Sequence, residues 1–287
     1  MTAGERRATL DAIASEVRVC DRCRLSEGRA NAVPGEGSPD TEVVFVGEGP
    51  GSNEDRQGRP FVGRAGDLLE ELLGLVGWRR DDVYITNVVK CRPPGNRDPE
   101  PDEIAACQPF LKRQLEVLDP ALIVTLGRFS LQTFMPGDRI SRVHGTARPI
   151  DPETGARAAT GYAMYHPAAA LRQGALKETM QRDMAQVPEL LIRVRNERAA
   201  AAPVAPIPEP AAPATDVPET TPAADATAAA DASAAETAPA SVPLPTSTPV
   251  ATPAATETTS PPTVATATDQ GEEPDPMKIS DDQLGLF

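Results

Sequence analysis

Val43 to Gly66 read VVFVGEGPGSNEDRQGRPFVGRAG, and this stretch decides the fold. Apolar residues run into the glycine-rich turn Gly47–Gly51, and a polar loop then leads into a helical pattern. This order is typical of a buried strand that ends in a ligand loop, because open α/β sheets bind ligands at the carboxyl ends of their strands. The glycine spacing is G-x-G-x-G and Pro50 lacks an N–H group, so the turn does not match the G-x-G-x-x-G loop of dinucleotide-binding folds.

Apolar runs of strand length alternate with helical patterns on both sides of this stretch. Further strands are expected at 83–89, 121–126 and 162–165, and helices at 10–19, 66–76, 101–118, 127–134 and 179–195. Such alternation predicts an α/β fold: a three-layer α/β/α sandwich with a parallel central sheet of about four strands. The loop after Gly47, the loop Asn87–Asn96 and the loop at His166 should then meet at one edge of the sheet.

The composition divides the chain of 287 residues into three parts. Residues 1–198 form one domain and carry 27 basic against 29 acidic residues, whereas residues 199–287 carry 1 against 13. Residues 199–279 are rich in Ala, Pro and Thr, so they are predicted to be a disordered acidic linker before a short peptide, 280–287. We expect a cytoplasmic, nucleoid-associated protein, because the sequence has neither a secretory signal nor an apolar run long enough to span a membrane.

The four cysteines form a C-x2-C pair followed, after a long gap, by a C-x15-C pair. Reduced thiols in a cytosolic protein are better candidates for metal ligation than for disulfides. Four thiolates can hold either a structural Zn2+ ion or a [4Fe–4S] cluster, and their spacing does not decide between the two. The predicted ligands are Cys20, Cys23, Cys91 and Cys107.

Four motifs together resemble a known family. They are GEGPG at 47–51, GRPFVG at 58–63, NVVKCRPPGNR at 87–97 and HPA at 166–168. In this order, and with all four cysteines, they are similar to the family 4 (iron–sulfur) uracil-DNA glycosylases. The resemblance covers residues 10–195 and implies an α/β/α sandwich, a [4Fe–4S] cluster and removal of uracil from single- or double-stranded DNA.

The residue chemistry suits a pocket for a base that has been flipped out of the DNA. The side-chain amide of Asn87 offers a donor for uracil O4 and an acceptor for N3–H, and cytosine presents the opposite pattern. Phe61 can stack on the base, and His166 can donate a hydrogen bond to uracil O2 as negative charge develops there. The predicted uracil-binding residues are Gly47, Glu48, Phe61, Asn87 and His166.

Other assignments rest on the resemblance and stay open at this point. Glu48 either orients the attacking water or closes the pocket against the methyl group of thymine. Glu54 and Asn96 are alternative groups for positioning that water, so the catalytic candidates are Glu48, His166, Asn96 and Glu54. After His166, Leu171 is expected to fill the vacated base stack and Arg172 to contact a phosphate.

The chain ends in a second motif, Gln283-Leu284-Gly285-Leu286-Phe287. It resembles the peptide by which bacterial proteins bind the sliding clamp, with Gln283, Leu284, Leu286 and Phe287 as the contacting residues. The sequence therefore predicts a monomeric, monofunctional uracil-DNA glycosylase tethered to the clamp. The alternative is a metal-bearing adaptor that binds DNA and recruits the clamp without cleaving a glycosidic bond.

Overall fold

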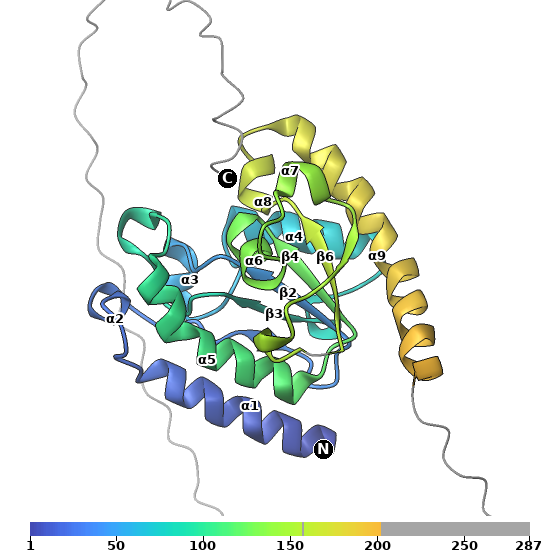
Figure 1. The fold of residues 1–287 in the computed structure, drawn as a ribbon. Helices are drawn as coiled ribbons and strands as arrows, with labels where there is room; N and C mark the ends of the chain where they lie inside the picture. The colour runs from blue at the N-terminus through green and yellow to red at the C-terminus, as the bar shows by residue number, and fades with distance from the viewer. Residues whose placement is uncertain (157, 202–287) are drawn as a thin grey trace, which may run out of the picture. The chain divides into compact units, whose positions relative to one another are not determined.

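The computed structural model describes residues 1–156 and 158–201; the predicted terminal peptide and all but the first three residues of the predicted linker lie outside this part. A six-stranded sheet with the order β1-β3-β2-β4-β6-β5 lies at the centre of the described residues (Figure 1). The strands are β1 (Glu36–Gly37), β2 (Val43–Gly47), β3 (Tyr84–Asn87), β4 (Leu122–Leu126), β5 (Ala147–Pro149) and β6 (Thr160–Met164).

The four inner strands, β3, β2, β4 and β6, are parallel, as predicted. The sequence did not indicate the two edge strands, which pair antiparallel: β1 with β3 and β5 with β6. Both are only two or three residues long, and all three residues of β5 are exposed. Such short segments cannot show the period of two by which strands are recognised.

Helices cover both faces of the sheet and form the predicted three layers (Figure 1). Side chains of β2 alternate between the two resulting cores, with Val44 and Val46 in one and Val43 and Phe45 in the other. The first core includes side chains of α1 (Ala3–Arg18), α5 (Pro101–Leu118), α6 (Arg128–Phe134) and α7 (Ile140–Val143). The second includes side chains of α4 (Arg64–Leu75), α8 (Pro167–Ala170) and α9 (Gly174–Ala201).

Local signals explain where several helices begin. Thr2 and Glu5 form a capping box at the start of α1, so this helix begins earlier than the apolar pattern indicated. Pro101 stands in the first turn of α5, as predicted. The last helix, α9, is longer at both ends than the predicted 179–195. Its outer turns mix alanine with charged residues and carry little of the apolar periodicity by which a helix is predicted.

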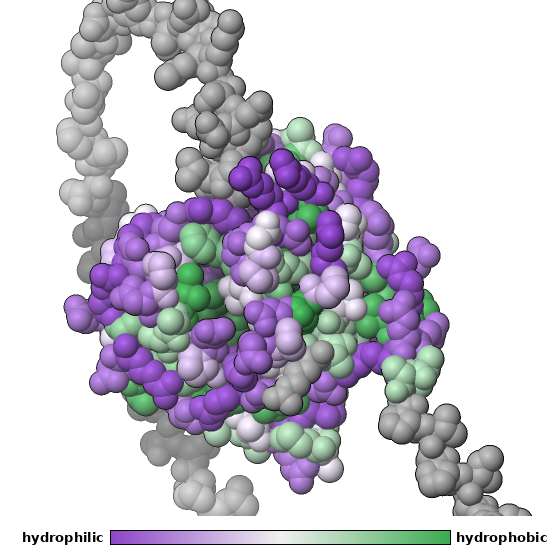
Figure 2. Space-filling view, in the orientation of Figure 1, coloured by the Kyte–Doolittle hydropathy of each residue, from purple (hydrophilic) through white to green (hydrophobic). Residues whose placement is uncertain are grey.

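The remaining helical segments are short and belong to connections. They are α2 (Leu25–Gly28), α3 (Ser52–Gln57), and the 3-10 turns η1 (Arg80–Asp82), η2 (Pro94–Asn96) and η3 (Pro152–Thr154). The face in Figure 2 is mostly hydrophilic, with hydrophobic side chains visible in small groups among the polar ones. No helix within residues 1–156 and 158–201 combines the length and the apolar composition that a bilayer crossing requires.

Candidate active site

One cavity of about 330 Å³ lies at the carboxyl ends of the parallel strands. It is lined by residues of the three loops that the sequence predicted to meet, and this convergence is confirmed. The loops come from distant parts of the chain, and the parallel sheet alone brings them to one edge. The predicted site residues that line the cavity are Glu48, Glu54, Phe61, Asn87, Asn96, His166 and Arg172.

Asn87 ends β3 and is 2% exposed, so its side-chain amide is enclosed by protein and faces the cavity. Among the described residues, no donor reaches the Oδ1 atom of Asn87. A buried acceptor without a donor costs about 1–3 kcal/mol, and a bound ligand that carries an N–H group would remove this penalty. Asn87 is therefore prepared to accept a hydrogen bond from a ligand.

Gly47 does not line the cavity, but it makes room for two residues that do. A Cβ atom on Gly47 would lie 2.4 Å from Oδ1 of Asn87 and 2.6 Å from Cζ of Phe61. Both separations are shorter than any real contact, so a larger residue would push the amide or the ring out of place. The role that Gly47 plays in the site is to let these two side chains approach each other.

Phe61 occupies the left-handed region with φ of 51° and is 5% exposed. A bulky residue in this conformation is an outlier that costs on the order of 1–3 kcal/mol, and such strain gathers at functional sites. The Phe61 ring stacks on the ring of His166, with a centroid distance of 5.7 Å and an interplanar angle of 28°. The two rings thus form an aromatic wall along the cavity.

His166 follows β6 and has a defined tautomer. The backbone N–H of Ala168 donates to Nδ1 of His166 over 3.1 Å, so Nδ1 carries a lone pair. Burial, and then the positive charge of Arg172, lower the pKa of His166 to about 4. At neutral pH the ring is therefore uncharged with its proton on Nε2, which is the form that can donate one hydrogen bond to a ligand.

Glu48 follows β2, and its carboxyl group forms no hydrogen bond with the described residues. Burial and the nearby charge of Asp98 raise the pKa of Glu48 to about 7, and the positive charge of Arg128 opposes this shift. The raised pKa means that both the acid and the carboxylate are populated near neutral pH. A carboxyl group in this state suits general-base catalysis.

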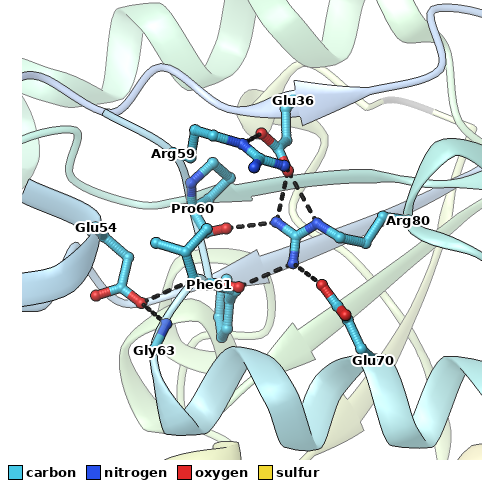
Figure 3. A network of polar contacts seen from close by, with 9 residues as sticks. Glu36, Glu54, Arg59, Pro60, Phe61, Gly63, Glu70 and Arg80 are labelled. Carbon is cyan, nitrogen blue, oxygen red and sulfur yellow. Dashed lines mark hydrogen bonds and ion pairs between the residues drawn. The ribbon is translucent and has the colours of Figure 1, made fainter. Parts of the chain in front are cut away.

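Glu54 and Asn96 line the cavity but also have structural partners. Oε1 of Glu54 accepts hydrogen bonds from the backbone N–H groups of Val62 and Gly63, both at 3.0 Å (Figure 3). Asn96 has φ of 56°, and its Oδ1 accepts a hydrogen bond of 2.7 Å from Nε of Arg92. Because these oxygens are already engaged, neither residue is as free as Glu48 to hold a water molecule.

The loop after His166 places its two predicted DNA contacts differently. Arg172 lines the cavity, whereas Leu171 lies outside its lining and is 39% exposed. A large apolar side chain that is exposed beside a polar cavity is suited to insertion between bases. The roles predicted for Leu171 in the base stack and for Arg172 at a phosphate stay predictions.

Sequence reasoning missed an ion pair at this cavity. Asp98 and Arg128 both line it and are joined by a salt bridge, and these are the two charges that act on the pKa of Glu48. Asp98 follows the recognised loop and Arg128 begins α6 after Gly127. The position of Arg128 directly after a strand was the signal that could have pointed to it, since that is where ligand residues gather.

The four cysteines are free and line a second, small cavity next to the first. The guanidinium of Arg29 donates to Sγ of Cys91 over 3.0 Å, and the backbone N–H of Lys90 donates to Sγ of Cys107 over 3.2 Å. Such donors stabilise thiolates in metal and cluster sites. Within the described residues, no three metal-binding side chains are gathered closely around the position of a single ion.

Lys90 lines the cysteine cavity and is 1% exposed. Its Nζ donates to Oγ1 of Thr86 over 2.6 Å and to the backbone oxygen of Asn87 over 2.8 Å. Burial lowers the pKa of Lys90 to about 8. The residue before Cys91 thereby fixes the main chain at Asn87, so the cysteine cavity and the amide of Asn87 are parts of one connected structure.

Comparisons with known proteins agree with this geometry. A family model described as the uracil DNA glycosylase superfamily matches residues 34–187, which include every residue named above as lining the cavity at the strand ends. A type-4 uracil-DNA glycosylase from Sulfurisphaera tokodaii is 46% identical over 190 residues, covering 64% of this chain and 86% of that protein. One from Thermotoga maritima is 52% identical over 146 residues, covering 51% and 76%.

The similarity to a type-5 uracil-DNA glycosylase is lower than the similarity to the type-4 proteins. A type-5 uracil-DNA glycosylase from Thermus thermophilus is 36% identical over 121 residues, covering 37% of this chain and 55% of that protein. The resemblance to the type-4 proteins that the motifs indicated is therefore confirmed by identity over most of those proteins' length. The chain belongs to the uracil-DNA glycosylase superfamily, and within it to the group with type-4 sequences.

Proposed function

We propose that this protein is a uracil-DNA glycosylase, which flips uracil out of single- or double-stranded DNA and hydrolyses its N-glycosidic bond to start base excision repair. The observation that carries the proposal is the buried Oδ1 atom of Asn87, which lacks a donor. The N3–H group of uracil supplies that donor, whereas the unprotonated N3 of cytosine would place a second acceptor there. The amide thus distinguishes uracil from cytosine, the base whose deamination produces it.

Bond cleavage leaves negative charge on uracil and positive character on the sugar. The Nε2–H group of the neutral His166 donates a hydrogen bond that stabilises the negative charge developing at uracil O2. This stabilisation does not require His166 to transfer its proton to the base. The stacked rings of Phe61 and His166 hold the base in a fixed plane, so this donor keeps its direction. Water then attacks the sugar, and Glu48 in its ionised form orients that water.

A simple assay distinguishes this enzyme from an adaptor that binds DNA without catalysis. The protein is incubated with a uracil-containing oligonucleotide, which is then treated with alkali to cleave the strand at any abasic site. The enzyme yields strand cleavage at the uracil position, and an otherwise identical oligonucleotide with thymine stays intact. Binding without strand cleavage would favour the adaptor.

The titration of Glu48 predicts how excision depends on pH. Because its pKa is raised to about 7, the ionised fraction rises through neutral pH, and the single-turnover rate of excision should rise with it between pH 6 and 8. Glu48→Gln should be slower and should lose this rise. A wild-type rate that stays constant over this range would exclude ionised Glu48 as the group that orients the water.

The same shift predicts the opposite trend for stability. The pKa of Glu48 is higher in the folded chain than its ordinary value, so the stability contribution of the protonated group is complete below about pH 4.5 and is lost as pH rises through about 7. Glu48→Gln should therefore unfold at higher denaturant concentration than wild type at pH 8. The difference should shrink at pH 5.

We also propose that Cys20, Cys23, Cys91 and Cys107 hold a [4Fe–4S] cluster rather than Zn2+. Support comes from the similarity to type-4 uracil-DNA glycosylases, which the motifs resemble as an iron–sulfur family, and from the N–H donors that stabilise two of the sulfurs as thiolates. We call the cavity at the carboxyl ends of the parallel strands the base cavity. When bound, the group would stabilise the wall of the base cavity through Lys90, which hydrogen-bonds the main chain at Asn87. Absorbance near about 400 nm from the purified protein would identify the cluster, and its absence together with stoichiometric zinc would reject it.

The predicted terminal peptide lies outside the described residues, and its role is part of the proposal. We propose that Gln283, Leu284, Leu286 and Phe287 bind the bacterial sliding clamp, and that the monomeric enzyme acts in the cytoplasm at the nucleoid. Deleting 283–287 should abolish binding to the clamp and leave excision on short oligonucleotides unchanged. Clamp binding that survives the deletion would reject the assignment.

A further inference from the structure

The strained conformation of Phe61 is maintained by a residue outside the cavity lining. Arg80 begins η1, shortly before β3, the strand that carries Asn87. Its guanidinium donates from Nη1 to the backbone oxygen of Phe61 over 2.8 Å and from Nη2 to that of Pro60 (Figure 3). Two consecutive carbonyl groups are thereby drawn toward one rigid cation.

The guanidinium of Arg80 is itself held on both sides. Oε1 of Glu36 accepts hydrogen bonds from Nε at 2.9 Å and from Nη2 at 2.7 Å, and Oε1 of Glu70 accepts one from Nη1 at 3.3 Å. These three bonds and the two to the main chain equal the five N–H donors of a guanidinium. A lysine could not reproduce this arrangement, because an ammonium has three donors and no planar fork.

The position of Arg80 excludes a direct contact with the substrate. Its side chain is 13% exposed, it does not line the base cavity, and every N–H group has an acceptor within the protein. Any effect of Arg80 on the reaction must therefore pass through the residues that it holds. Arg59, which also pairs with Glu36, is 56% exposed and does not donate to the carbonyl groups of Pro60 and Phe61, so it holds Glu36 without holding these two groups.

The loop of residues 60–63 is held by Glu54 as well as by Arg80. Glu54 accepts the N–H groups of Val62 and Gly63, so Arg80 and Glu54 together hold four consecutive residues, 60–63. A Cβ atom on Gly66 would lie 1.9 Å from the backbone oxygen of Phe61, which shows how closely α4 packs against this loop. The contacts around Phe61 thus keep its backbone in the left-handed conformation. A strained residue persists only where the surrounding structure holds it in this way.

We propose that Arg80 is a positioning residue for uracil excision: it fixes the left-handed backbone of Phe61 so that the ring remains stacked beside His166 and against the flipped base. This proposal rests on the glycosylase function proposed above. It adds a requirement that the base-stacking ring is set in place by Arg80 and by its partners on β1 and α4, Glu36 and Glu70. Arg80 acts on the base only through Phe61.

A double-mutant cycle tests whether Arg80 acts through Phe61. Single-turnover excision is measured on a uracil oligonucleotide for wild type, Arg80→Met, Phe61→Ala and the double variant, with binding of free uracil as a second readout. Arg80→Met should lower the excision rate and weaken uracil binding by roughly 10- to 50-fold, as expected for a misplaced cavity wall. In the Phe61→Ala background the same change should cost less than about 3-fold, since the ring that it positions is gone.

Arg79→Met is the matched control, because Arg79 is the neighbouring residue, is 79% exposed and pairs with the nearby Asp82. It should excise uracil at the wild-type rate. Arg80→Lys should not rescue the loss, because an ammonium cannot supply the five N–H donors of the guanidinium. Glu36→Gln is a milder variant for the case in which Arg80→Met does not fold, because glutamine keeps an acceptor oxygen for Arg80. It should show a smaller loss of excision rate, and this loss should also disappear in the Phe61→Ala background.

The outcomes separate this proposal from the proposed function. If wild type fails to excise uracil, the glycosylase function is wrong. If wild type is active and Arg80→Met and Glu36→Gln match it, the positioning role is wrong while the function stands. A loss that is equally large with and without the Phe61 ring would also overturn the role, because it would show a general effect on the fold.

Discussion

His166→Ala should lower the single-turnover rate of uracil excision by roughly 10²- to 10³-fold, about 2.7–4 kcal/mol, which is the usual effect of removing one oxyanion donor. The reason is the tautomer: the N–H group of Ala168 occupies Nδ1, so the proton of His166 is on Nε2 and is available to uracil O2. Alanine offers no donor there. The rate is measured on a uracil oligonucleotide with the enzyme in excess.

Two comparisons separate this loss from a general disturbance of the site. His166→Gln keeps an N–H donor on a side chain of similar reach, so it should retain more activity than His166→Ala. Because the pKa of His166 is lowered to about 4, the advantage of histidine over alanine should be constant from pH 6 to 8. An advantage that disappears as pH rises through this range would show that the charged imidazolium acts instead.

His144→Ala is the control for the loss of a histidine. His144 is the second of the two histidines, and its Nδ1 lies 2.9 Å from Oδ2 of Asp183 on α9. It does not line the base cavity. This change should lower the midpoint of unfolding through the loss of that contact and leave the excision rate within a few-fold of wild type.

The parts of this fold that the sequence predicted are those where one physical requirement dominates a segment. The inner strands are buried on both faces, as the uninterrupted burial of β2 and β4 shows, and such strands need continuous apolar runs. Gly47 and Asn87 could be assigned to a ligand loop because each directly follows or ends such a run. The edge strands β1 and β5 are exposed or half-buried and obey no such requirement.

The parts of the site that the sequence did not predict depend on contacts between distant segments. The resemblance offered Glu54 as an alternative group for positioning water, but the hydrogen bonds that its Oε1 accepts from Val62 and Gly63 could not be predicted. Arg80 is separated from Phe61 by 19 positions and stands in a polar turn that resembles any surface turn. Nothing in the local pattern distinguishes such an arginine from one that faces solvent.

Electrostatic states are equally hidden from a sequence. The pKa of Glu48 depends on its burial and on Asp98 and Arg128, which follow it by 50 and 80 positions. The state of His166 depends on a backbone N–H two residues further along, which faces its ring only because α8 begins there. The motifs identify which groups are present, and the folded chain determines which protonation state each group takes.

Asn87→Asp should lower uracil excision and reduce the preference for uracil over cytosine. In the proposed complex the amide donates to uracil O4 and accepts from N3–H, whereas an aspartate would place a negative charge opposite O4. The loss of the hydrogen bond to O4 and the repulsion between O4 and the carboxylate should reduce the stabilisation of the transition state by about 3 kcal/mol. This corresponds to a fall of roughly 100-fold in kcat/KM for uracil. The ratio of kcat/KM for uracil to that for cytosine is measured with two oligonucleotides that differ only at the target base.

The change of preference follows from which groups remain unpaired in the cavity. In wild type, cytosine leaves its N3 lone pair facing Oδ1 of Asn87, the buried atom that already lacks a donor. An aspartate accepts from the N4 amino group of cytosine, and in its protonated form it also donates to N3. In Asn87→Asp, cytosine therefore no longer leaves polar groups unpaired, whereas uracil does. The value of kcat/KM falls for uracil and rises for cytosine, so the ratio of the two decreases.

Asn196→Asp provides the matched control, because Asn196 is exposed on α9 and the substitution changes the net charge by the same amount. It should leave both the rate and the preference unchanged. A preference for uracil that stays at the wild-type value in Asn87→Asp, with the excision rate reduced, would show that Asn87 only supports the cavity wall. Selection against cytosine would then have to arise from the shape of the cavity between Phe61 and Glu48.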